Sequence, residues 1–284
     1  MRPRTARGRL VAWSGQAWLS VWFVLPLVPL LLWGAATRWP YPELLPTSWG
    51  PTGFVAAVHD GAIAAFATSF AFGLVTAALA VPAGAMAAHA LAFDPPPAAR
   101  TFSVLLLAPV FVPPLVLVMG LNVALLRAHI PPLAGIALIL MVTAVPYTTF
   151  VMRTAYSGYD RVFEDEARTL GADPRAVLFH VRIPLLAGPL TAAAFLAFLV
   201  GWSDYVVTLI VGGGLVVTVP LKVAAAASGT GNDAVVAALS VASVAPPLLL
   251  LVVIGAVSRS GRRSRTRQLT ATHLLQPVAA GAIS

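Results

Sequence analysis

Apolar residues run along the chain in six long blocks, separated by short polar stretches rich in Pro and Gly. The blocks cover residues 18–37, 61–91, 101–125, 131–151, 185–211 and 233–257. A helix that crosses the hydrocarbon core of a membrane needs about 20 mostly apolar residues, and each block reaches that length. Breaks such as Asp94-Pro95-Pro96-Pro97 and Gly212-Gly213-Gly214 are typical of helix ends. The pattern predicts an all-α integral membrane protein with six transmembrane helices.

Proline and glycine inside the blocks modify this picture. A proline inside a helix removes a backbone hydrogen bond and kinks the helix, whereas a glycine allows a neighbouring helix to approach closely. The prolines are Pro26, Pro29, Pro82, Pro109, Pro113, Pro114, Pro146, Pro246 and Pro247. We expect close helix contacts at Gly73, Gly84 and Gly201.

The first block has a possible alternative role as a signal peptide, because four arginines precede it before residue 10. It is long for the apolar region of a signal, it contains two prolines, and it ends in Gly34-Ala35-Ala36-Thr37 without a clear cleavage site. We therefore expect it to remain as the first membrane helix.

Composition supports a membrane protein over a soluble one. Hydrophobic residues make up 59% of the 284 residues and charged residues only 10%, whereas soluble domains contain about 25% charged residues. The net charge of +8 raises the alternative of a nucleic-acid surface. However, 15 of the 18 basic residues fall in the segments that a six-span chain with a cytoplasmic N-terminus keeps inside, namely 1–17, 92–100, 152–184 and 258–284. This distribution follows the positive-inside rule, so both termini are predicted to be cytoplasmic and no nucleic-acid partner is expected.

The inventory of reactive side chains gives no sign of an enzyme. The chain has no cysteine, and its five histidines are at least thirty residues apart, so no short metal-ligand pair exists. We expect a non-catalytic chain without a metal site.

One polar segment, residues 152–184, carries half of the acidic residues and five arginines. Its length far exceeds the two to eight residues that usually join packed helices. Residues 161–170 lack Gly and Pro, Gly171 suits a helix end, and Asp173-Pro174 suits a helix start. The sequence predicts two short helices joined at Gly171, with the second ending near Pro184. Such an exposed, charged element with an apolar stripe suits docking to another protein.

The same segment resembles the cytoplasmic signature of permease subunits in binding-protein-dependent ABC importers. That signature reads E-A-A, three residues, G, nine residues, then I-x-L-P. Ala167, Gly171 and Pro184 match it, Val181 and Ile183 are conservative replacements, and Asp165 and Glu166 depart from it at the first two positions. The resemblance covers roughly residues 55–260.

The resemblance implies a type I importer permease in the bacterial inner membrane, as well as its partners. These are two ATPase subunits that bind ATP and Mg²⁺, a second permease subunit, more often a different chain than an identical one, and an external solute-binding protein. The chain itself is expected to bind no cofactor, and its only lysine, Lys222, lies outside any Walker A motif. On this resemblance the residues expected to couple the chain to the ATPase are Glu164, Asp165, Glu166, Ala167, Gly171, Ala172, Val181, Ile183 and Pro184.

The fifth block supplies candidates for the substrate pathway. Asp204 is the only acidic residue inside an apolar block, where an unpartnered charge is costly. Its surroundings resemble the spermidine/putrescine-type and thiamine-type branch of the family, although sugar importers also carry an acid there. The candidate pathway residues are Trp202, Ser203, Asp204, Tyr205 and Thr208. A packing or hydrogen-bonding role for Asp204 remains an equal alternative.

The predicted organisation has four parts. A basic cytoplasmic N-terminus covers 1–17, the first helix and an external loop cover 18–60, a core permease domain covers 61–257, and a flexible basic tail near anionic lipid covers 258–284. Two other classes remain as alternatives: an ion-coupled secondary transporter, which would favour internal repeats and buried charges, and a membrane-embedded enzyme, which would need a cluster of catalytic groups.

Overall fold

The computed structural model describes residues 15–274 except 17, 23, 26, 41, 96 and 232, and the side chains as far as residue 256. The expected basic N-terminus up to residue 14, Pro26 and residues 275–284 lie outside the described residues. The chain divides into two compact units. The first contains Met1–Phe70 and Ser203–Ala245, and the second contains Ala71–Trp202 and Pro246–Ser284. Helices α4 (Ala62–Phe93) and α14 (Asp233–Leu274) contribute to both.

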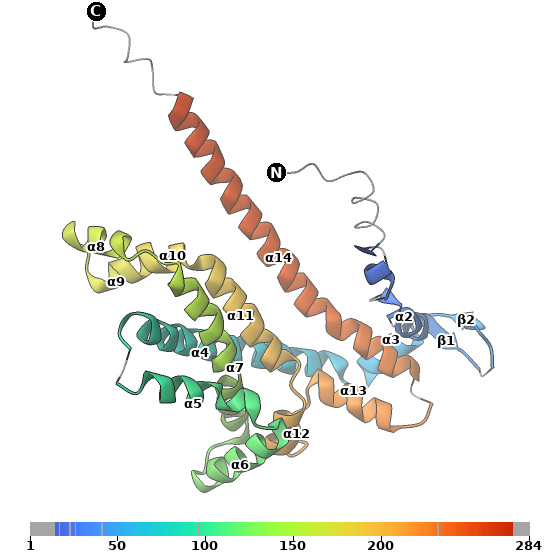
Figure 1. Ribbon diagram of the computed structural model, residues 1–284. Coiled ribbons are helices and arrows are strands. Elements are labelled where there is room, and N and C mark those ends of the chain that lie inside the picture. Colours follow the sequence, from blue (N-terminus) through green and yellow to red (C-terminus); the bar gives the residue numbers. More distant parts are fainter. Residues whose placement is uncertain are drawn as a thin grey trace, which may run out of the picture. The chain divides into compact units, whose positions relative to one another are not determined.

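The first unit combines short helices with a small antiparallel sheet (Figure 1). Its remaining elements are α2 (Leu27–Ala35), β1 (Ala36–Arg38), β2 (Ser48–Trp49), α3 (Thr52–His59), α12 (Val206–Gly212) and α13 (Val219–Ser228). Ala36 pairs with Trp49 and Arg38 with Ser48. Its core holds Ala57, Ala62 and Leu239.

The prediction of one continuous helix over residues 18–37 is wrong at its C-terminal end, where the chain forms the strand β1. Helix α2 ends at Ala35, and the chain then pairs with β2. The backbone N–H of Gly50 donates to the carbonyl of Ala35 at 2.9 Å, and that of Thr47 donates to the carbonyl of Arg38 at 3.0 Å. Backbone groups that a longer helix would have paired internally are thus satisfied by the sheet and its loop.

The second unit is built on the continuation of α4, α7 (Pro132–Ser157) and α11 (Ala187–Trp202), with α7 and α11 packed together (Figure 1). The three expected glycine contacts are confirmed. A Cβ at Gly73 would lie 2.6 Å from the ring of Phe198, one at Gly84 would lie 2.7 Å from Thr148 Cβ, and one at Gly201 would lie 2.6 Å from the carbonyl oxygen of Phe72. The helices approach too closely there for any larger residue.

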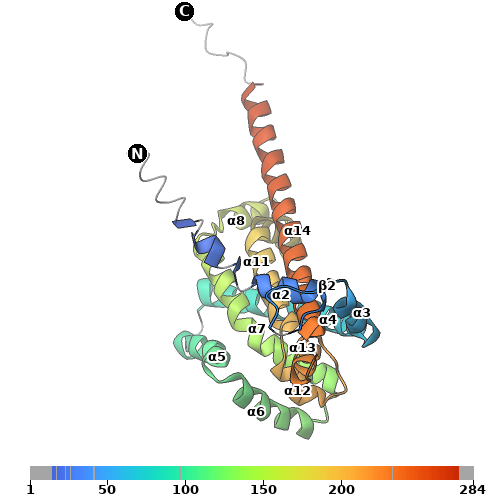
Figure 2. The same cartoon turned by 90° about the vertical axis from the view of Figure 1, so that its right-hand side faces the viewer.

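The third apolar block is two helices, not one. α5 (Ala99–Phe111) and α6 (Pro114–Arg127) are bent by 109° relative to each other (Figure 2). Val112 is extended, with φ −82° and ψ 132°, and Pro113 has ψ 130°. A residue that precedes proline is pushed out of the helical region, so consecutive prolines at 113 and 114 break the helix.

The fifth and sixth blocks also differ from the prediction. The fifth is interrupted at residues 203–205, between α11 and α12, and the sixth continues past the expected end at 257 to Leu274. The helical backbone of α14 therefore enters the segment expected to be a flexible tail. By length and composition, α4, α7 and the part Asp233–Ala256 of α14 suit membrane spans. The bent pair α5–α6, and a second bent pair formed by Pro174–Leu185 and α11, raise the number to five among the described residues. The six-span count stays a prediction.

Candidate functional site

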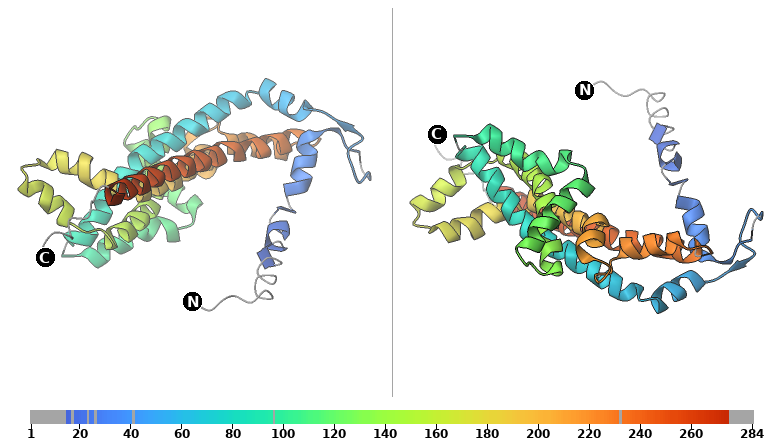
Figure 3. Two further views of the ribbon diagram at one scale, coloured as in Figure 1. Left: turned by 90° about the horizontal axis from the view of Figure 1, so that it is seen from above. Right: turned by 90° about the horizontal axis from the view of Figure 1, so that it is seen from below.

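The polar segment forms a helical hairpin, which we define as residues 160–186. Its helices are α8 (Val162–Thr169), α9 (Pro174–Ala176), the π-helix η1 (Val177–Arg182) and α10 (Ile183–Leu185). α8 lies beside the helix formed by α9 and η1, as the yellow-green and yellow ribbons of Figure 3 show. The hairpin follows the end of α7 and leads into the start of α11.

The turn of the hairpin follows the sequence prediction. Gly171 has φ +87°, a conformation that favours glycine. Asp173 caps the second helix, because its Oδ1 accepts the backbone N–H of Ala176 at 2.9 Å, and Pro174 occupies the first helical position. The second helix ends near Pro184 as expected, because α10 ends at Leu185, one residue after Pro184.

A buried ion pair joins the two arms of the hairpin. The Nε of Arg182 donates to Oε1 of Glu164 at 2.8 Å, and its Nη2 donates to Oε2 at 2.7 Å. The hydroxyl of Tyr159 donates to the same Oε1 at 2.8 Å, and Arg168 lies 3.5 Å from Oε2. The side chain of Glu164 is only 1% exposed. A bidentate arginine contact with further donors satisfies a carboxylate that burial would otherwise destabilise.

These contacts fix the protonation states of Glu164 and of its hydrogen-bond donor Tyr159. Hydrogen bonding to Arg182 outweighs burial and lowers the pKa of Glu164 to about 2, so the carboxylate is ionised at neutral pH. Burial and the hydrogen bond to Glu164 raise the pKa of Tyr159 to about 12, so its hydroxyl remains a donor. The cluster therefore holds its charge pattern over the physiological range.

Aromatic residues anchor the base of the hairpin to the ends of α4 and α7. Phe93 meets Tyr156 edge-on with ring centroids 5.5 Å apart, and Tyr156 meets Tyr159 at 6.0 Å. The guanidinium of Arg161 lies 4.7 Å from the centre of the Phe93 ring, within the range of a cation–π contact. A cavity of about 540 Å³ adjoins this base, and Pro82, His89, Leu178 and Arg182 are among its lining residues.

The three acidic residues of α8 differ in burial. Glu164 is enclosed within the hairpin, whereas Asp165 and Glu166 are exposed. The sequence placed Glu164 among the residues that couple the chain to the ATPase; its side chain is 1% exposed, so any part it plays in coupling is from inside the hairpin and not by direct contact with a partner. Of the other expected coupling residues, Ala167, Ala172 and Val181 are half-buried, and Gly171, Ile183 and Pro184 are exposed.

Sequence reasoning missed Arg182 and Tyr159 as site residues. The side chains of Tyr159, Glu164 and Arg182 come together because the hairpin folds back on itself, which brings Glu164 and Arg182, 18 residues apart, into contact. The only signal was an acid and a base placed on opposite arms of a predicted hairpin, and many other pairings of the segment's charges were equally compatible with it.

The expected pathway residues fall on both sides of the break between α11 and α12. Trp202 ends α11 in the second unit, where it is buried and stacks on Phe198 at 6.0 Å. In the first unit, Asp204 accepts the backbone N–H groups of Val207 and Thr208 at 3.2 and 2.9 Å. Asp204 precedes the N-cap residue Tyr205, and its side chain accepts free amides of the first turn of α12, so it does not lie within a continuous span.

The other pathway candidates of the first unit differ in exposure. Thr208 is buried, and its hydroxyl lies 3.3 Å from that of Thr218. Ser203 and Tyr205 are exposed. Asp204 is half-buried.

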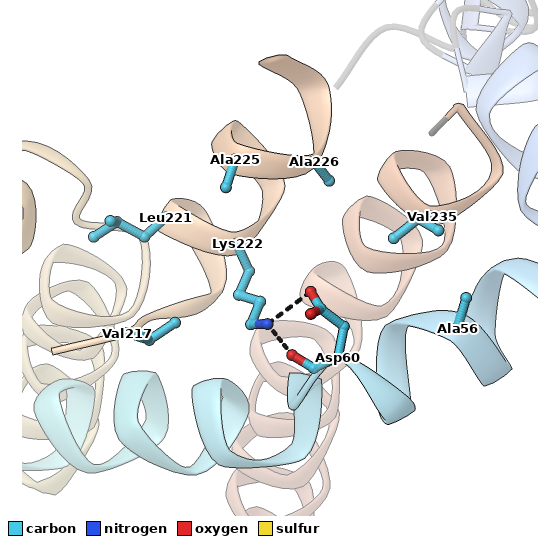
Figure 4. Close-up of a pocket in the computed structure, with 8 residues that line it drawn as sticks. All are labelled: Ala56, Asp60, Val217, Leu221, Lys222, Ala225, Ala226 and Val235. Atoms are coloured by element: carbon cyan, nitrogen blue, oxygen red, sulfur yellow. Dashed lines mark hydrogen bonds and ion pairs between the residues drawn. The ribbon is translucent and has the colours of Figure 1, made fainter. Parts of the chain in front are cut away.

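A second cavity, of about 600 Å³, lies within the first unit (Figure 4). Its walls are apolar apart from an ion pair, in which Lys222 Nζ lies 2.8 Å from Asp60 Oδ2 and also donates to the Asp60 carbonyl. This contact ties α13 to the turn between α3 and α4. Among the described residues, no group of three or more His, Cys, Asp or Glu could hold a metal ion.

Residues 80–264 match the family of binding-protein-dependent transport system inner membrane components. This chain belongs to that family. The matched region contains the whole helical hairpin, and the family assignment makes the chain a multi-pass component of the inner membrane.

Relatives of this inner membrane component include proteins named as 2-aminoethylphosphonate transport system permease PhnV. The Salmonella typhi protein is 28% identical over 169 residues, which cover 58% of this chain and 64% of the relative, so the match spans just under two thirds of its length. The Salmonella typhimurium protein is 26% identical over 194 residues, covering 67% of this chain and 72% of the relative. The fold is similar to a crystal structure of a bacterial ABC transporter involved in the import of the acidic polysaccharide alginate. That match has a TM-score of 0.62 at 17% identity, covering 90% of this chain and 99% of the other.

Proposed function

We propose that this chain is a non-catalytic permease subunit of an ATP-driven importer, and that the helical hairpin couples it to a separate ATPase. The observation that carries the proposal is the hairpin itself. It lies within the family match, is anchored at its base, and exposes a mixed apolar and acidic surface.

The docking surface is formed by the apolar residues that the hairpin leaves exposed together with its outward acids. Val162 is 53% exposed, Phe163 52%, Leu170 88% and Phe179 61%. Asp165 and Glu166 lie among them in sequence and are also exposed. Large apolar side chains flanked by charge are typical of a protein interface, and a short amphipathic element of this kind fits a groove on a partner.

Movement of the ATPase would reach the membrane region through both ends of the hairpin. Gly171 and Ala172 form the turn, Ala167 and Val181 are half-buried on the two arms, and Ile183 and Pro184 lead into α11. The aromatic anchor connects the first arm to α4 and α7. A displacement of the docking surface is thereby transmitted to three long helices of the second unit.

The proposed assembly contains two ATPase subunits that bind ATP and Mg²⁺, a second permease that completes the pathway, and an external solute-binding protein. Lys222 is the only lysine of the chain, and it pairs with Asp60, so this chain offers no Walker A lysine for ATP. Hydrolysis therefore belongs to a partner.

Substitutions in the hairpin test this proposal. Phe163→Asp and Phe179→Asp place charges on the docking surface and should abolish co-purification of the ATPase, whereas the exposed change Thr154→Ala in α7 should leave it intact. Gly171→Pro forces φ to about −65° where the turn needs +87°, and we expect it to retain membrane insertion but lose ATP-dependent uptake. The matched change Gly158→Ala, at a glycine with φ −109° and nothing within 4 Å, serves as its control. ATPase capture and uptake by all three hairpin variants at wild-type levels would refute the assignment.

The solute is proposed to be a small charged organic molecule. The sequence resemblance favours polyamine-like or thiamine-like solutes, with sugars as an alternative, whereas the relatives carry names that refer to 2-aminoethylphosphonate. Aminoalkyl phosphonates are therefore the first solutes to test, with spermidine, thiamine and maltose as comparisons. Uptake into vesicles loaded with ATP also separates an importer from an ion-coupled carrier, because only the carrier would work on an ion gradient without ATP.

A further inference from the structure

We infer that Arg182 is a positioning residue for coupling: its contact with Glu164 locks the two arms of the hairpin into one body that moves as a unit. The inference rests on the proposed function, because a rigid hairpin matters only if the hairpin transmits force. It assigns Glu164 and Tyr159 to the inside of the coupling element and leaves docking to their exposed neighbours.

The π-helix places Arg182. In an α-helix of 3.6 residues per turn, residues five apart point about 140° away from each other, but the i to i+5 hydrogen bond of a π-helix brings them close to the same face. The backbone N–H of Ile183 donates to the carbonyl of Leu178, five residues earlier. In this register Arg182 shares the face of Val177, which is 2% exposed and lies five residues before it. An α-helical register would turn the guanidinium away from the arm that carries Glu164.

π-helical turns are rare because their backbone geometry is less favourable, and they occur frequently at functional sites. Here the side-chain contacts compensate for the backbone. Arg182 forms two hydrogen bonds with Glu164, and the carboxylate accepts a third from Tyr159. The π turn and the ion pair therefore stabilise each other.

Burial separates this role from docking. Glu164 is 1% exposed and Arg182 21%, whereas Asp165 is 66% exposed. A partner can reach Asp165 without disturbing Glu164. Loss of the inner pair should consequently leave the docking surface chemically unchanged while letting the arms move independently.

The position of η1 in the chain gives the pair its mechanical importance. η1 is followed directly by α10 and then by α11, which packs along α7. If η1 relaxed to an α-helix, the following residues would rotate about the helix axis relative to α8. Force applied to α8 would then deform the hairpin and would not displace α11.

The test measures solute taken up per ATP hydrolysed, in the complete importer reconstituted with its ATPase and binding protein. For Glu164→Gln and Arg182→Gln we expect this ratio to fall about tenfold, the factor that corresponds to one lost charged hydrogen bond, while the ATPase still co-purifies and hydrolyses ATP. Arg182→Lys, which cannot form the bidentate contact, should lie between them and the wild type. The reversed pair Glu164→Arg with Arg182→Glu should recover part of the ratio.

Two controls make the result specific. Arg175→Gln removes an exposed arginine from the same arm, and Arg153→Gln removes an exposed arginine from α7. Neither arginine belongs to the docking surface or to the inner pair, so both variants should keep the wild-type ratio. The reversed pair also guards against misfolding, since a pair that restores coupling must fold.

The outcomes are distinguishable. Wild-type ratios in both Gln variants would overturn the inference and leave the proposed function standing. Loss of ATPase capture in the Gln variants, with no recovery in the reversed pair, would also overturn it, because the pair would then act only in docking or folding. A wild-type chain that captures no ATPase would refute the proposed function and the inference with it.

Discussion

Asp204 and Thr208 are joined twice across the first turn of α12: the backbone N–H of Thr208 donates to Asp204 Oδ2 at 2.9 Å, and its hydroxyl lies 3.4 Å from the Asp204 carbonyl oxygen. The other carboxylate oxygen accepts from Val207 at 3.2 Å. Both oxygens are therefore engaged by the free amides of a helix start, where a negative charge is also favoured by the helix dipole.

The first prediction follows from these contacts. Asp204→Ala should lower the free energy of unfolding by about 1 kcal/mol, the usual cost of losing a side chain that accepts the free amides of a helix start, whereas Asp204→Asn should preserve it within a few tenths of a kcal/mol. Thermal unfolding in detergent measures both. We expect Asp204→Asn to retain uptake, and loss of uptake by a normally stable Asn variant would instead show that the charge contacts the solute.

The second prediction concerns helix packing in the second unit. Gly201→Ala should destabilise the chain by about 1–3 kcal/mol, the usual cost of overpacking, because the added Cβ would lie 2.6 Å from both the carbonyl of Phe72 and the hydroxyl of Thr76. Gly188→Ala in the same helix meets nothing within 4 Å. It should be neutral or slightly stabilising, since alanine favours a helix by up to about 1 kcal/mol over glycine. Equal unfolding temperatures for the two variants would contradict the close approach.

Local sequence features predicted some of these elements well. The core of α4 and α7, the glycine contacts and the Asp173 cap each depend on a few neighbouring residues, so the sequence contains the relevant signal. Hydrophobicity was less informative about whether an apolar block forms one continuous helix. It marks the third and fifth blocks as apolar, but the backbone conformation at Val112 and the side-chain contacts of Asp204 determine where those blocks break.

The inner ion pair could not be predicted in the same way. It needs the turn at Gly171 and the π register before Arg182, and neither changes the hydrophobic pattern. The small sheet formed by β1 and β2 could not be predicted from the sequence either. Its strands have only three and two residues, and such short strands leave almost no periodic signal.

The third prediction is a pH dependence. The folded pKa of Glu164, about 2, lies below its unfolded value, so its contribution to stability is present at neutral pH and is lost as the pH falls from about 4.5 towards 2. The folded pKa of Tyr159, about 12, lies above its unfolded value of 10.0, so its contribution is present below pH 10 and is lost as the pH rises towards 12.

Unfolding temperatures measured across these windows test the signs. The Glu164→Gln variant should lose the part of the acid dependence that comes from this carboxylate, and Tyr159→Phe should lose the alkaline part. An acid limb that is identical in the wild type and in Glu164→Gln would contradict the low pKa.

The fourth prediction is the membrane orientation. Because 15 of 18 basic residues fall in the expected inside segments, a reporter fused after Arg267 should lie in the cytoplasm. A reporter inserted beside Thr47, at Leu44, should lie outside, and that site is 91% exposed. Paired alkaline phosphatase and fluorescent protein fusions measure both positions, and finding them on the same side would exclude the odd number of spans, five, that a six-span chain places between them.

The last prediction is the composition of the complex. The second unit leaves large apolar side chains exposed on α5 and α6, including Leu105, Phe111 and Val116, and such a surface must face lipid or another membrane chain. The family relation and the need for a pathway wider than one kinked bundle favour a second permease, and the resemblance to the polyamine-type branch favours a different chain over a second copy. Native mass spectrometry of the solubilised importer should therefore find this 29.5 kDa chain once, beside one other permease and two ATPases. Finding two copies of this chain would contradict the predicted heterodimer and show that the permease pair is a homodimer. A transport-competent particle with no second permease would show that one chain forms the whole pathway.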